Sequence, residues 1–391
     1  RSETIRNTYM HRSYLGVLEK ASNDTPRDIN RRLAFDLIRR LQPVSRADLA
    51  RASGLQRSTI SLIVEQLIAA QWVVEGSLGF LPMGRRPTLL QLSERRAVVV
   101  VDVHPGRANI AIGSIDGSLG AQIPVALSNG AKEGSRQLAS AIKKLMKAHP
   151  ERLFHGIGMS LPGGVDDAQR LIFAPNLNWL HCDIQSVLQR ATGLPVEIEN
   201  AANISLLGEL WFRGANEARH LALVAVAEGI GVGVVSNGLM VRGMNGLAGE
   251  IGHLTLDEDG PACHCGARGC WETYASNRAA ERYYKTLRGR ASGASFEELL
   301  RLADQGDGLA VQALEQMAFQ LGRGLRILTT AYSPEAIIIS GELTAQWKRF
   351  APILESALRR HTLAGSAPKL VPSNDGALSR LRGGIALVLQ R

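Results

Sequence analysis

The sequence predicts an α/β protein with a small helical head and a larger body of two α/β lobes. Helical periodicity runs from Asn30 to Leu67, and apolar strand-like runs alternate with amphipathic segments from Ala97 onward. A period near 3.6 indicates a helix, whereas a short continuous apolar run suits a buried strand. The chain has 391 residues, of which 45% are hydrophobic and 21% charged. It can therefore bury the cores of two or three domains.

The head is expected to span residues 27–96, after an N-terminal tail at residues 1–26 that shows no sustained period. Its first helix ends before Pro43 and carries an apolar face made of Leu33, Leu37, Ile38 and Leu41. Ser45 is placed to cap a short second helix, and Gly54 provides the turn into a third. The third helix turns inward Ile60, Ile63, Val64 and Leu67. This order of helices predicts a helix-turn-helix.

The segment after the third helix predicts a wing, because two strand-like pieces flank a Gly- and Pro-rich loop at residues 72–92. Residues 1–96 hold 16 Lys+Arg against 9 Asp+Glu, a net charge of +7, while the remaining residues carry only +2. A basic head favours a polyanionic partner. We therefore expect a winged helix-turn-helix that binds operator DNA, palindromic and A/T-rich. The alternative is a small helical domain for protein contacts.

The expected DNA contacts lie at the start of the third helix, whose polar edge suits a major groove. They are Gln56, Arg57, Ser58, Thr59 and Ser61. Arg85 and Arg86 on the wing precede Pro87. They are expected either in a narrow A·T-rich minor groove or on phosphates alone.

The body, residues 97–391, begins with the buried strand Ala97–Val103. Further strands are expected at Ala108–Ile115, Gln122–Leu127, Leu153–Ser160, Val196–Glu199, His220–Ala227 and Val232–Ser236. Helices dominate after Ala275. We expect one lobe at about residues 97–203 together with the C-terminal helix, and the other at about 204–375. The sequence shows no apolar run of the length a membrane span needs and no signal-peptide pattern, so we expect a cytoplasmic protein without a membrane partner.

A histidine and three cysteines predict a structural zinc site. They are spaced His-x9-Cys-x-Cys-x4-Cys and comprise His253, Cys263, Cys265 and Cys270. One imidazole and three thiolates suit tetrahedral Zn²⁺. The alternatives are a Cys263–Cys270 disulfide, free buried thiols, or His264 in place of His253 as the fourth ligand.

The same region resembles the signature of the ROK family, which groups sugar kinases and sugar-responsive repressors. GLAGEIGH at residues 246–253 and CHCGARGCWETYAS at 263–276 carry the resemblance, and RADLARASGLQRSTIS at 46–61 is similar to the winged-helix domain of ROK repressors. The resemblance implies an actin-like, two-lobed body with a zinc loop, assembled as a homodimer or homotetramer. It also implies monosaccharide contacts at Asn200, Glu250, His253 and Glu272. Asn176, Asn178 and Trp179 would border the pocket, with a core position as the alternative for Trp179.

Two departures from the kinases of that family predict a protein that is not an enzyme. Family kinases grip phosphate with an Asp-x-Gly-Gly-Thr turn, whereas this turn contains His104 and Pro105, and proline has no N–H to donate to a phosphate. Ala201 replaces the catalytic aspartate, so the sequence predicts no catalytic residue and the loss of a general base. The glycine-rich loop at Glu228–Gly233 remains. Asp166 or Asp167 is the alternative base.

These features together predict a transcriptional repressor of carbohydrate-metabolism genes. A monosaccharide bound in the cleft would modulate the affinity of the head for DNA. Two alternatives stay open: an active ATP-dependent sugar kinase with a DNA-binding head, and a DNA-binding regulator that does not respond to sugar.

Overall fold

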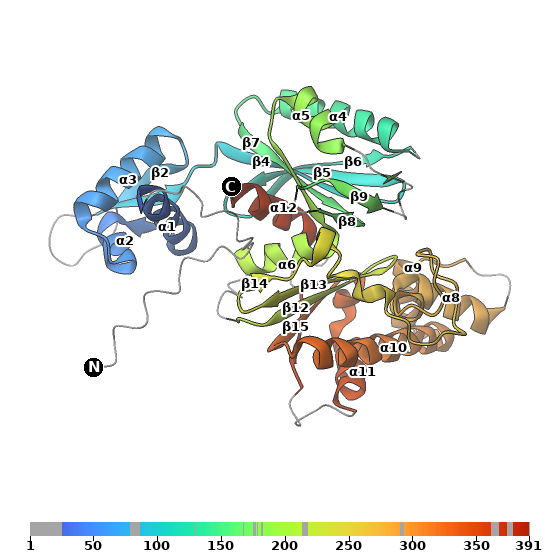
Figure 1. The fold of residues 1–391 in the computed structure, drawn as a ribbon. Helices are drawn as coiled ribbons and strands as arrows, with labels where there is room; N and C mark the ends of the chain where they lie inside the picture. The colour runs from blue at the N-terminus through green and yellow to red at the C-terminus, as the bar shows by residue number, and fades with distance from the viewer. Residues whose placement is uncertain are drawn as a thin grey trace, which may run out of the picture.

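The structure is a computed structural model that describes residues 26–390 except 79–86, 129, 167, 175–176, 178, 181–182, 213–217, 290–292, 361–366 and 374–377. Figure 1 shows a small helical unit beside two larger α/β units, which lie one above the other. The fold is therefore mixed α/β. In the described part of the chain, no helix is long and apolar enough to cross a membrane.

The head packs three helices against a small sheet. In chain order its elements are α1 (Pro26–Leu41), β1 (Val44–Ser45), α2 (Arg46–Ser53), α3 (Arg57–Ala69), β2 (Val73–Leu78) and β3 (Thr88–Leu92). The strands pair antiparallel in the order β1-β3-β2. Ser45 caps α2 in a capping box with Asp48, and Gly54 ends the helix in the left-handed conformation at φ 71°. The predicted inward face of α3 is buried.

The inward face of α1 differs from the sequence prediction. Ala34 and Ile38 are fully buried, whereas Leu41 is 47% exposed. Leu33 and Leu37 are only half-buried. Leu41 is the last residue of the helix, after which Gln42 and Pro43 lead into β1. Its side chain therefore lies beyond the surface that packs on α2 and α3. The prediction that Leu41 belongs to the buried face of the helix was wrong.

Lobe 1 is a five-stranded mixed sheet in the order β11-β7-β4-β5-β6. Its elements are β4 (Arg96–His104), β5 (Arg107–Ser114), β6 (Leu119–Ala126), α4 (Ala131–Ala148), β7 (Leu153–Leu161), β8 (Gly164–Val165), β9 (Leu171–Ala174), β10 (Trp179–Leu180), α5 (Ile184–Thr192) and β11 (Val196–Asn200). Helices α4 and α5 cover the outer face (Figure 1). Trp179 is 2% exposed and belongs to the core beneath α4. It is therefore a core residue and does not border the pocket.

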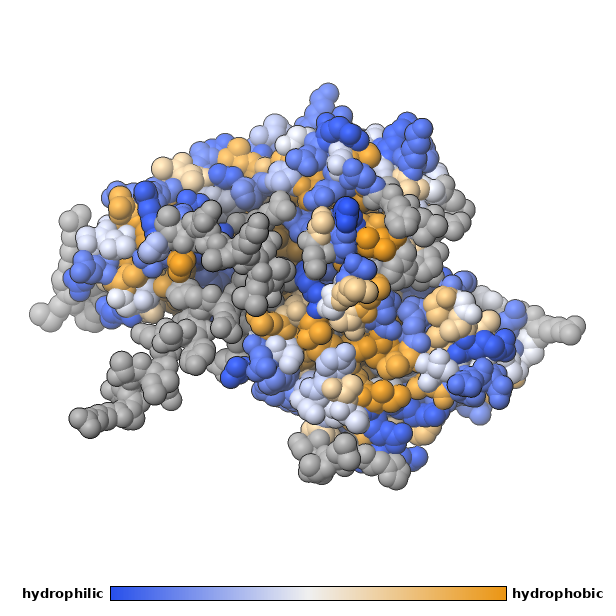
Figure 2. Space-filling view, in the orientation of Figure 1, coloured by the Kyte–Doolittle hydropathy of each residue, from blue (hydrophilic) through white to orange (hydrophobic). Residues whose placement is uncertain are grey.

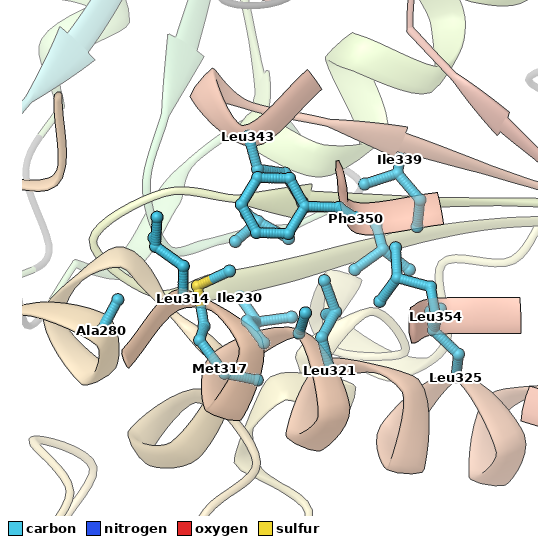
Figure 3. Close-up of a cluster of buried hydrophobic side chains, with 14 of the residues drawn as sticks. Ile230, Ala280, Leu314, Met317, Leu321, Leu325, Ile339, Leu343, Phe350 and Leu354 are labelled. Atoms are coloured by element: carbon cyan, nitrogen blue, oxygen red, sulfur yellow. The ribbon is translucent and has the colours of Figure 1, made fainter. Parts of the chain in front are cut away.

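Lobe 2 is a second five-stranded sheet, in the order β14-β13-β12-β15-β16. Its strands are β12 (Leu221–Val226), β13 (Ile230–Ser236), β14 (Leu239–Met240), β15 (Ala336–Ser340) and β16 (Lys369–Pro372). Its helices are α7 (Glu272–Ala275), α8 (Asn277–Arg288), α9 (Phe296–Asp304), α10 (Gly308–Tyr332) and α11 (Trp347–Arg359), with 3-10 turns at Met244–Gly246, Glu250–His253 and Glu342–Gln346. Figure 3 shows Phe350 and Leu354 of α11 meeting Leu321 and Leu325 of α10 in its core.

Two helices lie between the sheets, namely α6 (Ala201–Phe212) and α12 (Ser379–Leu389). Helix α12 packs on β4 and β7 of lobe 1, α6 packs on β12 and β13 of lobe 2, and the two helices pack on each other. Their backbones touch, because a Cβ on Gly383 would lie 1.7 Å from the carbonyl oxygen of Ile204.

On the face drawn in Figure 2, hydrophobic side chains gather over the sheet of lobe 2.

Candidate functional site

The predicted zinc ligands meet in one place. His253 ends the turn Glu250–His253, and the three cysteines follow on the loop that leads into α7. The ligand atoms of His253, Cys263, Cys265 and Cys270 all lie within 4.8 Å of one another. The loop can fold this tightly because Gly269 adopts φ 63°, where a Cβ would lie 1.6 Å from the carbonyl oxygen of Asp257. Only glycine fits there.

The spacing of these atoms suits a tetrahedral metal ion. The Sγ of Cys263 lies 3.5 Å from Nδ1 of His253, and the sulfurs of Cys265 and Cys270 are 3.6 Å apart. Zinc–sulfur bonds of about 2.3 Å place neighbouring ligand atoms about 3.8 Å apart in a tetrahedron. All three cysteines are free thiols, which argues against the disulfide alternative. His264 is exposed and lies outside the cluster.

His253 connects the metal cluster to the cleft. Its Nδ1 faces the cluster, and its Nε2 lies 3.5 Å from a carboxylate oxygen of Glu250. A metal ion on Nδ1 would leave the proton on Nε2, and the ring would then be oriented by its outer hydrogen bond. Burial raises the pKa of Glu250, His253 opposes this shift, and Glu272 adds to it. Glu272, the first residue of α7, has one carboxylate oxygen 3.6 Å from Nδ1 of His253.

The cleft between the lobes brings together all four residues expected to contact sugar. Its walls include Asn200 from the end of β11, Glu250 and His253 from the turn Glu250–His253, and Glu272 from α7. Two carboxylates, an imidazole and an amide provide acceptors and donors for a ligand with several hydroxyl groups. The lining of the cleft is polar at this end, where lobe 2 faces the end of β11.

Asn200 has a second role as the N-terminal cap of α6. Its Oδ1 accepts hydrogen bonds from the backbone N–H groups of Ala202 (2.8 Å) and Asn203 (3.4 Å). Its Nδ2 donates to the carbonyl oxygen of Gly163 at 2.8 Å. One amide N–H therefore remains for a ligand. A ligand on Asn200 would contact the residue that holds the first turn of α6.

The other end of the same cleft is lined by charged side chains. Here Nε2 of His104 lies 2.9 Å from a carboxylate oxygen of Asp102, and its Nδ1 lies 3.9 Å from Glu228 of lobe 2. Arg380 of α12 reaches the same place, with its guanidinium 3.7 Å from Asp102 and 3.4 Å from His104. The two cations, His104 and Arg380, thus share the carboxylate of Asp102, and His104 also faces Glu228 across the two lobes.

These contacts fix the charge states of the group. Burial alone would lower the pKa of His104, but its hydrogen bond to Asp102 and its ion pair with Glu228 outweigh burial and raise the pKa to about 9. The ion pair with His104 lowers the pKa of Glu228 to about 2 against an opposing effect of burial. Burial would raise the pKa of Asp102, yet Arg380 and His104 bring it below its usual value. At neutral pH His104 is therefore protonated, and Asp102 and Glu228 are ionised.

The glycine-rich loop at Glu228–Gly233 has a packing explanation. A Cβ on Gly229 would lie 2.5 Å from a carboxylate oxygen of Glu272. A Cβ on Gly231 would lie 3.1 Å from the Cβ of Ala202, and a Cβ on Gly233 would lie 3.0 Å from the carbonyl oxygen of Ala202. The glycines therefore allow Glu272 and α6 to approach the loop. Retention of this loop is consistent with packing alone and does not require a phosphate.

Among the described residues, neither Ala201 nor Asp166 provides a base in the cleft. Ala201 lines the cleft where the family aspartate is expected, and its methyl group cannot accept a proton. Asp166 is bound to Arg170, with a 2.9 Å hydrogen bond to Nε, and is not among the residues that line the cleft. Asp167, Asn176 and Asn178 lie outside the described residues.

The polar edge of α3 points away from the core of the head. Gln56, Arg57 and Ser58 are exposed, and Thr59 and Ser61 are half-buried. Arg85 and Arg86 lie outside the described residues, between the strands β2 and β3. The structure therefore places the helix residues on one accessible edge, and it leaves the two wing arginines as predictions.

Sequence reasoning missed Arg380 and the role of Glu228. Arg380 lies on the C-terminal helix, 276 positions from His104. Nothing in its local sequence marks it as part of the cleft, since Arg380 and Arg382 both lie near the start of the same helix. A partner for the unusual His104 could have been sought, but its position in the chain could not have been deduced.

The sequence and the architecture of this chain are similar to those of known proteins. Residues 100–391 match the sequence profile of the ROK family. The chain is 31% identical over 367 residues to the xylose repressor of Bacillus subtilis, covering 92% of this chain and 95% of that protein. The crystal structure of a ROK family transcriptional regulator, a homologue of the Escherichia coli MLC protein, superimposes with a TM-score of 0.79 at 26% identity, covering 93% of this chain and 96% of that one.

A kinase of the same fold matches a smaller share of the chain. The ROK glucokinase of Streptomyces griseus, solved with glucose and AMPPNP, superimposes with a TM-score of 0.67 at 27% identity and covers 74% of this chain but 97% of its own. The regulator thus matches the head and the body, whereas the kinase accounts for about the length of the body. The chain belongs to the ROK family.

Proposed function

We propose that this protein is a DNA-binding transcriptional repressor of carbohydrate-metabolism genes, whose affinity for operator DNA is modulated by a monosaccharide in the cleft between the lobes. One observation carries the proposal. Asn200, Glu250, His253 and Glu272 line one end of the cleft, while charged side chains around His104 that already contact one another line the other end. A site of this kind can bind hydroxyl groups but has no cradle for a nucleotide phosphate.

The zinc site braces the sugar end. His253, Cys263, Cys265 and Cys270 would hold Zn²⁺, which as a structural ion supplies fixed geometry rather than reactivity. The chain's own contribution is the orientation of His253, whose Nε2 side faces Glu250. A monosaccharide whose hydroxyls bridge Glu250 and Glu272 would therefore meet acceptors that are already positioned.

The head is proposed to be a winged helix-turn-helix in which α3 enters the major groove. The exposed edge at Gln56, Arg57 and Ser58 supports this assignment, with Thr59 and Ser61 beside it. Arg85 and Arg86, outside the described residues, are proposed as further DNA contacts. Two copies in a homodimer, or four in a homotetramer, would present paired heads to half-sites about one DNA turn apart. The protein is expected to act in the cytoplasm, where its DNA is.

The cleft is proposed to carry no phosphoryl transfer. Ala201 provides no base, and Pro105 provides no backbone donor in the turn after β4. The naming of the full-length relative as a repressor agrees with this. Sugar binding is thus available as a signal, because nothing consumes the bound molecule.

A titration tests the proposal directly. An operator duplex is selected with the full chain from a random-sequence DNA library, and its dissociation constant is measured with and without D-xylose, D-glucose or N-acetyl-D-glucosamine. We expect one sugar to change the constant by more than about fivefold, the lower range of allosteric coupling. Arg57→Ala should weaken operator binding and reduce its salt dependence, with exposed Arg136→Ala on α4 as the control. If no sugar binds in calorimetry and none alters DNA binding, the chain is not a sugar sensor.

A further inference from the structure

Helix α6 joins the sugar end of the cleft to the head. It begins at Ala201, directly after Asn200, and ends at Phe212 beside α1 of the head. Twelve residues at 1.5 Å each make it about 18 Å long. No loop intervenes between the residue that lines the cleft and the turn that meets the head. Figure 1 shows α6 in the centre of the molecule, between the two lobes.

The head holds the far end of α6 through Arg39. The Nη1 of Arg39 donates to the carbonyl oxygen of Trp211 at 2.5 Å, and the guanidinium lies 4.5 Å from the centre of the Trp211 ring and 5.8 Å from that of Phe212. The last carbonyls of a helix lack partners within it, and the negative end of the helix dipole favours a cation there. Arg39 therefore caps α6 from another domain.

This contact is buried and specific. The Arg39 side chain is only 6% exposed, and its Nη2 lies 2.7 Å from Asp36 on the same helix. Arg40 also pairs with Asp36 at 2.7 Å, but it is 42% exposed. A buried guanidinium that binds a carbonyl and stacks on an indole uses its planar shape, which lysine cannot reproduce. Arg39 of α1 thus contacts the end of α6, whereas its neighbour Arg40 is exposed to solvent.

Helix α6 can pass on displacement because it is closely packed. Residues 202–210 are all buried. A Cβ on Gly208 would lie 2.8 Å from the carbonyl oxygen of Ser379 on α12, and Gly233 of β13 leaves room for Ala202. Packed interiors have few voids to absorb a shift. A movement at the first turn of α6 therefore moves its last turn as well.

A second contact anchors the head to lobe 1. The ring of Trp72 lies 4.6 Å from that of His155 on β7, and Arg96 of β4 donates to the carbonyl oxygen of Ala70 at 2.5 Å. In the described residues the head is thus attached to lobe 1, whose Ile115 belongs to the core of the head, to Leu389 of α12, and to α6, which packs on the strands of lobe 2. Closure of the lobes that shifts α6 relative to lobe 1 would change the separation of these contacts and turn the head.

We propose that α6 transmits occupancy of the cleft to the head, with Asn200 capping its sugar end and Arg39 acting as the positioning residue at its DNA end. This inference rests on the proposed sugar-responsive function. A ligand that engages Asn200 prefers one position of the first turn of α6, and only such a preference can shift the equilibrium between head orientations. Arg39 contacts neither sugar nor DNA in this mechanism.

The test compares two neighbouring arginines in the full-length protein. Arg39→Ala removes the cap and the stacking, and Arg40→Ala removes an exposed partner of the same Asp36. The ratio of operator dissociation constants with and without the effective sugar of the xylose, glucose and N-acetylglucosamine set is the measurement. We expect the ratio to fall below about twofold in Arg39→Ala from a wild-type value above about fivefold, with sugar affinity unchanged. Arg40→Ala should keep the wild-type ratio.

Reciprocity provides the second readout. If operator and sugar are coupled through α6, operator DNA changes the sugar affinity of the wild type by the same factor, and Arg39→Ala abolishes this change as well. Arg39→Lys keeps the charge and is the fallback if Arg39→Ala does not fold; its ratio should lie well below the wild-type value because stacking on Trp211 is lost.

The outcomes separate this inference from the proposed function. A folded Arg39→Ala or Arg39→Lys protein that retains the wild-type ratio overturns the role of Arg39, although the chain remains a sugar-responsive repressor. A wild-type protein that binds none of the sugars overturns the proposed function and the coupling together. Loss of the ratio in Arg40→Ala as well would show a general effect of charge on α1 and would also count against Arg39.

Discussion

The two ends of the cleft differ in how their polar groups are satisfied. At the sugar end, the side chains of Glu250 and His253 are 28% and 27% exposed and have room for a ligand between the lobes. At the other end, Asp102 and His104 are 6% and 18% exposed and bind each other. Carboxylates that face an open cleft can accept hydrogen bonds from hydroxyl groups. Charged groups that are already paired can bind a phosphate only if their existing ion pairs break.

This difference separates two groups of side chains in one cleft. The residues proposed to contact a sugar lie at one end and the charged group around His104 at the other, so one set can change while the other persists. His104 links Asp102 of lobe 1 to Glu228 of lobe 2. The resulting ion-pair network spans the two lobes.

The largest expected effect comes from dismantling the brace of the sugar end. Cys265→Ser removes one of four metal ligands, so zinc should fall from one per chain to a small fraction of that value. Metal binding and folding are coupled, and we expect the free energy of unfolding to fall by more than about 4 kcal/mol, a size typical of losing a metal. His264→Ser, an exposed neighbour between the ligands, is the control. Elemental analysis showing one zinc per chain in Cys265→Ser contradicts the ligand set.

A carboxylate at each end tests whether sugar contacts only one of them. Glu250→Gln removes a charged acceptor, and we expect sugar affinity to fall about 10- to 100-fold, since hydrogen bonds to charged groups contribute about 1.5–3 kcal/mol. Glu228→Gln should change it less than about threefold, because Glu228 belongs to the paired end. Titration calorimetry with the effective sugar measures both. Equal losses in the two variants would erase the distinction between the ends.

The pH dependence of stability tests the paired end. The pKa of His104 is raised to about 9, so protonated His104 stabilises the folded state below about pH 6.5, and this contribution is lost as pH rises to about 9. The full effect is at most about 3 kcal/mol. Urea unfolding of wild type and His104→Gln between pH 6 and 10 should show a difference in stability that shrinks over this range. A difference that is constant with pH would contradict a charged His104 between Asp102, Glu228 and Arg380.

The smallest expected effect is that of Ala201→Asp, which should gain no kinase activity. Ala201→Asp restores a carboxylate at the position of the missing base, yet we expect no sugar-dependent release of ADP above background in a coupled assay. Asp102 remains paired with His104 and Arg380, and Pro105 still provides no N–H. The sugar affinity of the variant is measured in parallel to confirm an intact site. Turnover near about 1 s⁻¹, within the ordinary enzymatic range, would mean that the paired end still accepts a nucleotide.

Some features of this protein depend on residues that are close in the chain. The cluster of one histidine and three cysteines follows from a short spacing that begins at His253, the capping box from Ser45 and Asp48, and the strands of the body from continuous apolar runs. The loss of phosphoryl-transfer groups at Ala201 and Pro105 stays a prediction, which rests on side-chain type alone because a methyl group or a proline ring limits chemistry in any fold.

The remaining features depend on which distant residues the fold brings together. Arg380 meets His104 across 276 positions, and Arg39 meets the end of α6 across 172. Local periodicity also overstated the burial of Leu41 and left the role of Trp179 undecided, since both depend on where a neighbouring element ends. The amino-acid sequence by itself determined which chemistry is available, because side-chain type and short spacing are local properties. The tertiary structure alone decided which charges are paired and how the head is attached, because those contacts exist only after the sheets have packed around α6 and α12.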